Sequence, residues 1–575
     1  MSSRLIFIQK DICEALAVYF LSLVWIPAMV VSSLLLSGMK PWLTVTPMLS
    51  LLALAVLWGM IFGRFSLRNE LLIGAFVLGT VLISAALSLF FYDTAGDGIC
   101  YHAETILSML KGVNPVYQQL HSVYSEHYPK AAEYFSVVVI HTFGRYQLGK
   151  IYNFLLLFAA AAYACSFFLR FGLSGLTNAL ATAAVAMNPI AAAQLFCYYV
   201  DGAIGSLLTM ILFAIANIYV QPKRFDRTVF VMASSLAIGT KFTGGPYVVA
   251  ALCLLIFARL LSLRRKTSAK PSQLLITDAL TGVLAVLLGV VVLGYNPYIT
   301  NVRDGFHLLY PIMGENKIDV MTSNTPSVLL EHPYNRVQKF AISFFSRTFN
   351  NLRYVSINFN NHWGMKVPFT VSKGEIINCI YPDVRMGGWG TLFSGITLSA
   401  MAIFCLVQGW QRHEAILLEL ALVLFTTFLN PECWWARYTP QIALLPILLL
   451  LPVLSGVSAR HKLLPRILCV LLLLNNLVFV AGSGMANYIR AKRMFHKFDR
   501  IAMTSGRGEY WAYNVPNNQY QLEQFSGIHG IIICGQIDPP GLRLPPGGFP
   551  MTSSYSNTPE VVLYRGACST PPSSK

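Results

Sequence analysis

Residues 14–37 read EALAVYFLSLVWIPAMVVSSLLLS, an apolar run with a single acid at its start. A helix that crosses the hydrocarbon core of a membrane needs about 20 predominantly apolar residues. A second apolar run follows closely at residues 42–63. A cleaved signal peptide has an apolar region of only about 7–15 residues, so residues 14–37 are predicted to be a retained first membrane span.

The composition extends this prediction to the whole chain. Of its 575 residues, 55% are hydrophobic and only 12% are charged, whereas soluble domains average about 25% charged residues. This excludes a soluble enzyme, a disordered scaffold and a small secreted disulfide scaffold. The 11 cysteines show no CxxC spacing, although Cys534 and Cys568 are candidates for pairing in an oxidising compartment.

The apolar runs predict an all-α polytopic membrane protein with about 11–14 transmembrane helices. Residues 228–240 form the shortest run, and the glycine-rich stretch 239–246 separates it from the next run. A broken or re-entrant hairpin is therefore expected there. The expected spans lie near 14–37, 42–63, 71–91, 151–169, 173–193, 203–221, 228–240, 246–263, 275–295, 389–409, 414–430, 441–457 and 467–484.

The placement of basic residues predicts the orientation. The net charge is +17, and many of the basic residues lie in short stretches between apolar runs, as is typical of cytoplasmic loops. Residues 92–150, 296–388 and 485–575 then face the opposite, extracytoplasmic side, and an apolar strand at residues 531–534 indicates a small α/β segment at the C-terminal end. No nucleic-acid partner is expected. The short basic stretches are Arg64 and Arg68; Lys223, Arg224 and Arg227; Arg264, Arg265 and Lys266; and Arg460, Lys462 and Arg466.

Acidic residues gather directly after the third apolar run, where residues 92–104 read YDTAGDGICYHAE. Carboxylates kept at a membrane edge are costly and usually functional. Asp97, Tyr101 and Glu104 are spaced by four and three, so a helix would place them on one face. Two alternatives stay open: Asp93 or Asp97 is a plain helix cap, or the two carboxylates hold a divalent cation.

Three cations in later segments are candidates for binding an anion. Lys130 suits a phosphate, but a lysine whose head reaches solvent is the simpler interpretation. Lys241 lies between glycines in an apolar region and needs a partner, which is either a phosphate or Asp201. Arg437 is suited to bidentate binding of a phosphate. It equally fits an interfacial aromatic belt or an ion pair with Glu432.

Five short motifs follow one another along residues 90–440. They are Asp97 with Tyr101 and the turn Gly112-Val113-Asn114-Pro115; Tyr128-Pro129-Lys130; Asp201-Gly202; Thr240-Lys241-Phe242; and Arg437-Tyr438-Thr439-Pro440. In this order they resemble polyprenyl-phosphate-sugar-dependent glycosyltransferases of the C superfold, and the pattern is similar to that of the lipid A aminoarabinose transferase and protein O-mannosyltransferase group. The chain departs from this family pattern in two ways: the two prolines of a Lys-Pro-Pro element are absent beside Lys130, and two extra spans precede the first loop.

The resemblance implies a glycosyltransferase of the cell (inner) membrane with an extracytoplasmic active site. Residues 1–484 would form the transferase domain and residues 485–575 an extracytoplasmic C-terminal domain. The donor would be a sugar on polyprenyl phosphate, and the acceptor a glycan, lipid or protein. Asp97 is the expected general base, with Asp93 as the reserve, and no cofactor is implied. The expected substrate-binding residues are Tyr101, His102, Glu104, Lys130, Asp201, Lys241, Arg437 and Tyr438.

Two other functions stay open at this point. A polysaccharide polymerase or ligase would use a pyrophosphate-linked donor and arginines of a large external loop, such as Arg336, Arg347 and Arg353. A transporter or flippase of lipid-linked sugars would show an internal repeat and charges at the membrane midplane, and neither is evident. Residues 360–364, NNHWG, combine polar side chains with aromatic rings of the kind that stack on sugars.

Overall fold

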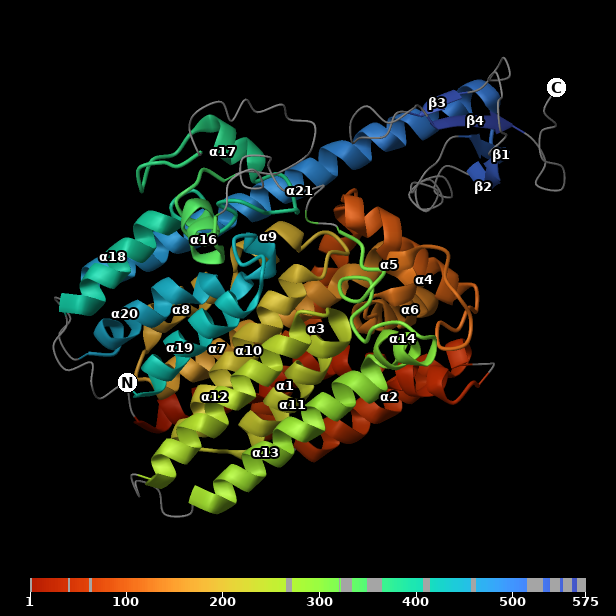
Figure 1. Cartoon of the computed structure of the whole chain (residues 1–575). Helices are drawn as coiled ribbons and strands as arrows, with labels where there is room; N and C mark the ends of the chain where they lie inside the picture. Colours follow the sequence, from red (N-terminus) through yellow and green to blue (C-terminus); the bar gives the residue numbers. More distant parts are fainter. Residues whose placement is uncertain are drawn as a thin grey trace.

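The computed structural model describes most of the chain as a bundle of helices followed by a small sheet (Figure 1). The described residues are 3–39, 42–61, 65–264, 271–319, 321, 334–348, 364–406, 414–456, 462–513, 531–537, 549–551 and 561–565. The segment at 360–363, Arg353, and the side chains of Cys534 and Cys568 lie outside the described residues.

The helices and strands confirm the prediction of a mainly helical polytopic protein. In chain order they are α1 (Ser3–Leu36), α2 (Trp42–Ile61), α3 (Leu67–Phe90), η1 (Gly98–His102), α4 (Ala103–Leu110), α5 (Val123–His127), α6 (Ala131–Phe143), η2 (Tyr146–Ile151), α7 (Tyr152–Arg170), α8 (Gly175–Ala186), α9 (Pro189–Gln194), α10 (Asp201–Val220), α11 (Arg224–Thr240), α12 (Gly244–Arg264), α13 (Pro271–Leu287), η3 (Leu288–Leu293), η4 (Tyr295–Ile299), α14 (Thr300–Arg303), α16 (Arg336–Phe344), α17 (Lys373–Asn378), α18 (Phe393–Leu406), α19 (Glu414–Leu429), η6 (Ala436–Tyr438), η7 (Pro440–Leu444), α20 (Leu445–Ser455), α21 (Leu463–Ser505), β1 (Gly508–Tyr513), β2 (Ile531–Ile537), β3 (Phe549–Met551) and β4 (Val561–Arg565).

Within the described ranges, 8 helices are long and apolar enough to cross a membrane. Four shorter apolar helical segments accompany them, at residues 131–143, 175–186, 393–406 and 440–455. The protein is therefore a multi-pass membrane protein.

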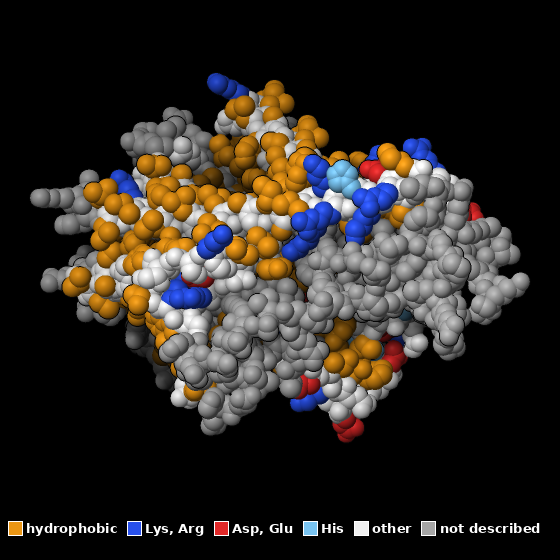
Figure 2. All heavy atoms as spheres, turned by 90° about the horizontal axis from the view of Figure 1, so that it is seen from above, with side chains coloured by type: hydrophobic (Ala, Val, Ile, Leu, Met, Phe, Trp, Pro, Cys, Tyr) orange, Lys and Arg blue, Asp and Glu red, His pale blue; other side chains and the backbone are white. Residues whose placement is uncertain are grey.

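The helix α10 forms the centre of the bundle. It packs against α7, α11, α12 and α19, and nearly all of its side chains are buried. The helices α2, α3 and α13 instead expose large apolar side chains, among them Leu51, Phe76 and Leu280. Figure 2 shows hydrophobic side chains spread over much of the visible surface, as expected where helices face lipid rather than water.

The span expected at 173–193 is broken in the structure. Helix α8 ends at Ala186, and Asn188 begins α9 by accepting a hydrogen bond from the N–H of Ile190 through its side chain. The side-chain amide of Asn188 also donates to the carbonyl oxygen of Pro440, 2.8 Å away. The break brings the end of α9 close to the start of α10.

The expected break is present, but α11 is longer than predicted, because it begins at Arg224, four residues before the predicted start. The chain turns at residues 241–243 and returns as α12. At about 1.5 Å per residue, α11 is roughly 26 Å long, close to the ~30 Å thickness of the hydrocarbon core. The turn at Lys241 therefore lies at the opposite end of the bundle from the basic loop at Lys223.

The end of the bundle at Lys223 carries a network of buried ion pairs. Arg170 contacts Glu14 and also Asp226, with Nη1 2.9 Å from Oδ2 of Asp226. Arg227 and Arg259 both contact Asp278, at 2.8 and 3.0 Å. These pairs join α1, α7, α11, α12 and α13 at the end that the basic loops predict to be cytoplasmic.

The helix α21 has 43 residues and runs past the predicted end of the last span at residue 484. Its outer half stays helical because Ala491, Met494, Phe498 and Ile501 are buried. The sheet follows with the strand order β2-β1-β4-β3; β1 and β2 are parallel, and β4 is antiparallel to β1 and β3. Figure 1 places this sheet beside the end of α21.

Candidate active site

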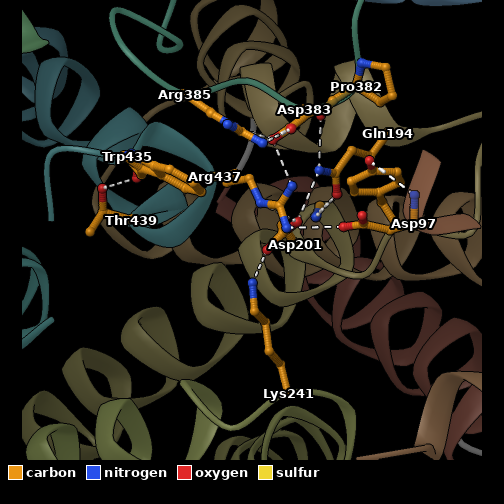
Figure 3. Close-up of polar contacts among 12 residues, drawn as sticks. Asp97, Gln194, Asp201, Lys241, Pro382, Asp383, Arg385, Trp435, Arg437 and Thr439 are labelled. Atoms are coloured by element: carbon orange, nitrogen blue, oxygen red, sulfur yellow. Dashed lines mark hydrogen bonds and ion pairs between the residues drawn. The ribbon is translucent and has the colours of Figure 1, made fainter. Parts of the chain in front are cut away.

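Charged side chains from five separate segments meet at the end of the bundle where α11 and α12 join (Figure 3). We call this group the Arg437 cluster. It comprises Asp97, Asp201, Lys241, Asp383, Arg385 and Arg437.

Arg437 lies at the centre of the cluster. Its Nη2 atom donates to Oδ2 of Asp97 at 3.1 Å, and its Nη1 atom donates to Oδ1 of Asp383 at 2.6 Å. Its Nε atom lies 3.4 Å from Oδ2 of Asp201. Burial disfavours the charge of this guanidinium, but the three carboxylates outweigh burial and raise the pKa of Arg437 above its ordinary value. Arg437 is therefore a permanent cation that bridges three acids.

Asp201 is the first residue of α10 and is buried, with 2% of its side chain exposed. It forms an ion pair with Lys241 and accepts a hydrogen bond from Nε2 of Gln194 at 3.1 Å. The N-terminal end of a helix also favours a negative charge. The ion pair between Lys241 and Asp201, one of the two predicted alternatives for Lys241, is thus confirmed.

Lys241 lies in the turn after α11, where its backbone is extended. Its ammonium group is 4.5 Å from the ring centre of Tyr438, a cation–π distance. One fifth of the Lys241 side chain is exposed, so Lys241 can pair with Asp201 and still reach an incoming anion.

Sequence reasoning missed Asp383 and Arg385. Asp383 accepts two hydrogen bonds from Arg385, at 2.5 and 3.1 Å, besides the one from Arg437. Burial opposes ionisation of Asp383, but Arg437 and Arg385 outweigh burial and lower the pKa of this carboxyl to about 2. The guanidinium of Arg385 lies 4.4 Å from the ring centre of Trp435. The only sequence signal was an acid and a base two residues apart ahead of the glycines at 387, 388 and 390.

Asp97 is the most accessible acid of the cluster, with 32% of its side chain exposed. Its backbone N–H donates to the hydroxyl of Tyr199 at 3.2 Å. Asp97 stands at the start of η1, but its side chain makes no capping hydrogen bond, so the capping interpretation is wrong for Asp97. The carboxylate instead points into the cluster (Figure 3).

Asp93 has a different environment. It is fully buried, and its two oxygens accept from the backbone N–H groups of Ala95 and Tyr198 at 2.8 and 2.9 Å. Burial raises the pKa of this carboxyl. A side chain at Gly98 would place its Cβ 2.1 Å from the Asp93 carboxylate, so this turn requires glycine. Asp93 thus holds the loop that carries Asp97.

The expected helical face of Asp97, Tyr101 and Glu104 does not form. The backbone is non-helical at Cys100, so the helical register is interrupted between Asp97 and Glu104. Glu104 accepts from the N–H of Ser122 and the hydroxyl of Ser125, both at 2.8 Å. Glu104 therefore fixes the loop before α5 and does not point into the cluster.

Aromatic rings line the region beside the cluster. The ring of Tyr128 lies 5.5 Å from that of Tyr101, 5.3 Å from that of Tyr124 and 5.8 Å from that of Phe242. Such rings can stack on the apolar face of a sugar or on a lipid chain. Tyr438 is adjacent to Arg437, and burial raises the pKa of its phenol to about 12, which keeps it neutral at neutral pH.

His102 lies behind this surface and is buried. Its Nδ1 atom is 2.5 Å from Oε1 of Glu133 on α6. The structure therefore joins η1 to α6 through His102.

Lys130 is placed apart from the cluster and is 1% exposed. Its ammonium group donates to the carbonyl oxygens of Glu126 and Tyr128, both at 2.8 Å, and to Oδ1 of Asn296. These three acceptors use all three N–H groups of a lysine. The expectation of a lysine that reaches solvent is wrong, and burial lowers the pKa of Lys130 to about 8.

The remaining candidates lie elsewhere. Glu432 accepts from Nε1 of Trp434 at 2.6 Å, so the expected pair with Arg437 is wrong. Arg336 donates to the carbonyl oxygen of Phe428, and Arg347 is exposed. Among the described residues, no group of three or more His, Cys, Asp and Glu is placed to hold a metal ion.

Comparisons with known proteins show a likeness in fold to solved structures. No protein-family model matches the chain, and no curated protein matches it. Among solved structures, the chain is similar in fold to the crystal structure of ArnT from Cupriavidus metallidurans bound to undecaprenyl phosphate. The identity is 12%, the match covers 80% of this chain and 85% of that chain, and the TM-score is 0.40.

Proposed function

We propose that this membrane protein is a glycosyltransferase that moves a sugar from a polyprenyl-phosphate donor to an acceptor hydroxyl on the extracytoplasmic side of the cell (inner) membrane. The observation that carries the proposal is the Arg437 cluster: an accessible carboxylate, Asp97, pairs with Arg437, and Asp201 joins Arg437 to a second cation, Lys241. The motifs that resemble C-superfold glycosyltransferases supply Asp97, Asp201, Lys241 and Arg437.

The chemistry needs a base for the acceptor and positive charge for the leaving phosphate. Asp97 takes the proton of the acceptor hydroxyl as its oxygen attacks the anomeric carbon. The bond between that carbon and the phosphate oxygen breaks, and its electron pair stays with the phosphate. Arg437 and Lys241 stabilise the negative charge that develops there. Direct displacement by the acceptor inverts the anomeric centre.

Several neighbouring residues would then position the reactants. Asp201 holds Lys241, and Asp383 holds Arg437. The rings of Tyr101 and Tyr128 provide an apolar wall on which a sugar or the first lipid units can stack. Acceptors of three kinds, a glycan, a lipid or a protein of the cell envelope, fit this chemistry.

The test is a transfer assay with the purified protein. A radiolabelled sugar on a short-chain polyprenyl phosphate is offered together with envelope lipids and glycans. Label should move to an acceptor fraction with the wild-type protein. Loss of a general base commonly lowers a rate about 10²–10⁴-fold, so Asp97→Asn should nearly abolish transfer.

The matched comparison is Asp93→Asn, because Asp93 holds a loop by accepting two N–H groups. The amide of this variant keeps one acceptor oxygen, so transfer should fall far less than in Asp97→Asn once protein stability is matched. Full activity of Asp97→Asn would exclude the mechanism, and a dead Asp93→Asn with an active Asp97→Asn would move the base to Asp93.

A further inference from the structure

Among the described residues, three carboxylates pair with Arg437. Each nitrogen of its guanidinium faces an acid: Nη1 faces Asp383, Nη2 faces Asp97, and Nε faces Asp201. These contacts engage three of the five N–H groups of the guanidinium, so a phosphate that binds at Nη2 competes with Asp97 for this nitrogen.

The three carboxylates are not held equally. Asp201 is 2% exposed and is also bound by Lys241 and Gln194. Asp383 is bound by two nitrogens of Arg385 as well. Asp97 is the most exposed of the three, and its contact with Nη2 of Arg437, at 3.1 Å, is longer than the 2.6 Å contact between Arg437 and Asp383. Asp97 is therefore the carboxylate that an incoming anion displaces most easily.

We propose that Asp97 occupies the place of the donor phosphate on Arg437, so that donor binding displaces this carboxylate and the site takes a singly charged phosphodiester. This inference rests on the proposed function and deepens it. Displacement turns Asp97 from an ion-pair partner into a free base beside the bound donor, so the base is released only when a donor is present.

The charges of the cluster support a donor with one negative charge. The six side chains of the Arg437 cluster are formally neutral together, three acids against three bases. Without Asp97 the other five carry a single positive charge. A sugar phosphodiester carries one negative charge and matches it, whereas a pyrophosphate carries at least two.

The reaction itself keeps this balance. When Asp97 takes the acceptor proton it becomes neutral, and the phosphate gains one negative charge as the glycosidic bond breaks. Arg437 then has no competing carboxylate at Nη2, at the step where the leaving phosphate needs it most.

The experiment measures the binding of methyl geranyl phosphate, a phosphodiester with one negative charge, to the detergent-solubilised full-length protein by titration calorimetry. Asp97→Asn removes the competing charge, so its dissociation constant should fall by roughly tenfold or more, the scale of one charge-assisted hydrogen bond. The matched control is Asp304→Asn, because Asp304 is also partly exposed and paired with an arginine, Arg303, on the same predicted side. Its affinity should equal that of the wild type. Asp97→Ala serves as a second variant and should bind as tightly as Asp97→Asn.

The outcomes separate this inference from the proposed function. If the wild type binds methyl geranyl phosphate and both Asp97 variants bind it no more tightly, Asp97 does not compete for Arg437, and the inference fails while the proposed function stands. If Asp304→Asn tightens binding equally, the effect is one of overall charge, and the inference fails again. If neither the wild type nor the variants bind methyl geranyl phosphate, the proposed function fails with the inference.

Discussion

At the scale of single residues, two lysines that look alike in the sequence have different environments. Lys130 gives all its N–H groups to protein oxygens, whereas Lys241 lies at the accessible edge of the cluster. We expect Lys130→Met to lower stability by about 3 kcal/mol, because three buried acceptors lose their donor, with geranyl phosphate affinity retained. Thermal unfolding in detergent measures the first effect and calorimetry the second.

The same substitution at Lys241 is the matched control. Lys241→Met should weaken the binding of geranyl phosphate roughly ten- to hundredfold, because a charge-assisted hydrogen bond of about 1.5–3 kcal/mol is lost. Equal losses of affinity in both variants would assign Lys130 to the phosphate after all.

Asp383 is expected to make the free energy of unfolding depend on pH under acidic conditions. Its pKa is about 2 in the folded protein, against the ordinary value of 3.8. A lowered pKa contributes stability that is present above pH 3.8 and is lost as the pH falls toward 2. We therefore expect the stability difference between the wild type and Asp383→Asn to shrink by about 2 kcal/mol between pH 5 and pH 2. Denaturant unfolding measured across this range checks it, and a difference independent of pH would contradict the role given to Arg437 and Arg385.

At the scale of elements, the break between α8 and α9 positions the acid at the start of α10. We expect Asn188→Ala to lower stability by about 1–3 kcal/mol, since a helix cap and a buried hydrogen bond to Pro440 are both lost. Transfer activity should also fall, because Gln194 on α9 would hold Asp201 less firmly. Unfolding and transfer assays on the same preparation measure both effects.

The control for Asn188 is Asn335, which caps the exposed helix α16 and makes a capping box with Gln338. Asn335→Ala should cost about 1 kcal/mol and leave transfer unchanged. A loss of transfer as large as that of Asn188→Ala would show that the assay reports helix capping in general and not the break before α10.

Hydropathy predicted most of the membrane helices, because a membrane span must satisfy its own backbone hydrogen bonds. Hydropathy mispredicted helix boundaries where tertiary packing determines them. The end of α21 was placed near residue 484 because charged residues begin at Arg490, but the buried stripe through Met494 and Phe498 keeps the helix going. At α8 and α9 the apolar run continues through the break, and only Asn188-Pro189 signals it.

The candidate site was predictable only in part. Asp97, Lys241 and Arg437 stood out because charges are rare in this chain, and the structure brings them together. Asp383 was missed because its partner Arg437 is 54 positions away in the sequence, and no spacing rule links two loops. The burial of Lys130 was missed because its three acceptors come from Glu126 in α5, from Tyr128 and from the distant Asn296.

At the scale of the whole molecule, the two ends of the bundle differ in chemistry. One end carries the ion pairs of Glu14, Asp226 and Asp278, and the other carries the Arg437 cluster. The basic loops predict that the first end is cytoplasmic. We expect a cysteine at exposed Gln118 to react with a membrane-impermeant maleimide in intact cells, and a cysteine at exposed Gln221 to react only after lysis. The unsubstituted protein is the background control.

The reverse labelling pattern would place the cluster in the cytoplasm and remove the extracytoplasmic acceptor from the proposed function. Labelling of both positions in intact cells would show that the maleimide enters the cells. Labelling of a cytoplasmic marker protein in the same cells checks for such entry.

The length of α21 has a mechanical consequence. A continuous helix of 43 residues is about 65 Å long at 1.5 Å per residue, roughly twice the thickness of the hydrocarbon core. Its inner half packs against α8 and α9, and its outer end leads into the sheet. A rigid rod of about 65 Å that pivots by about 5° at one end moves its other end by roughly 6 Å. Ser483, halfway along α21, donates to the carbonyl oxygen of Ala193 on α9, so a tilt of this rod couples the position of α9, which carries Gln194, to that of the sheet.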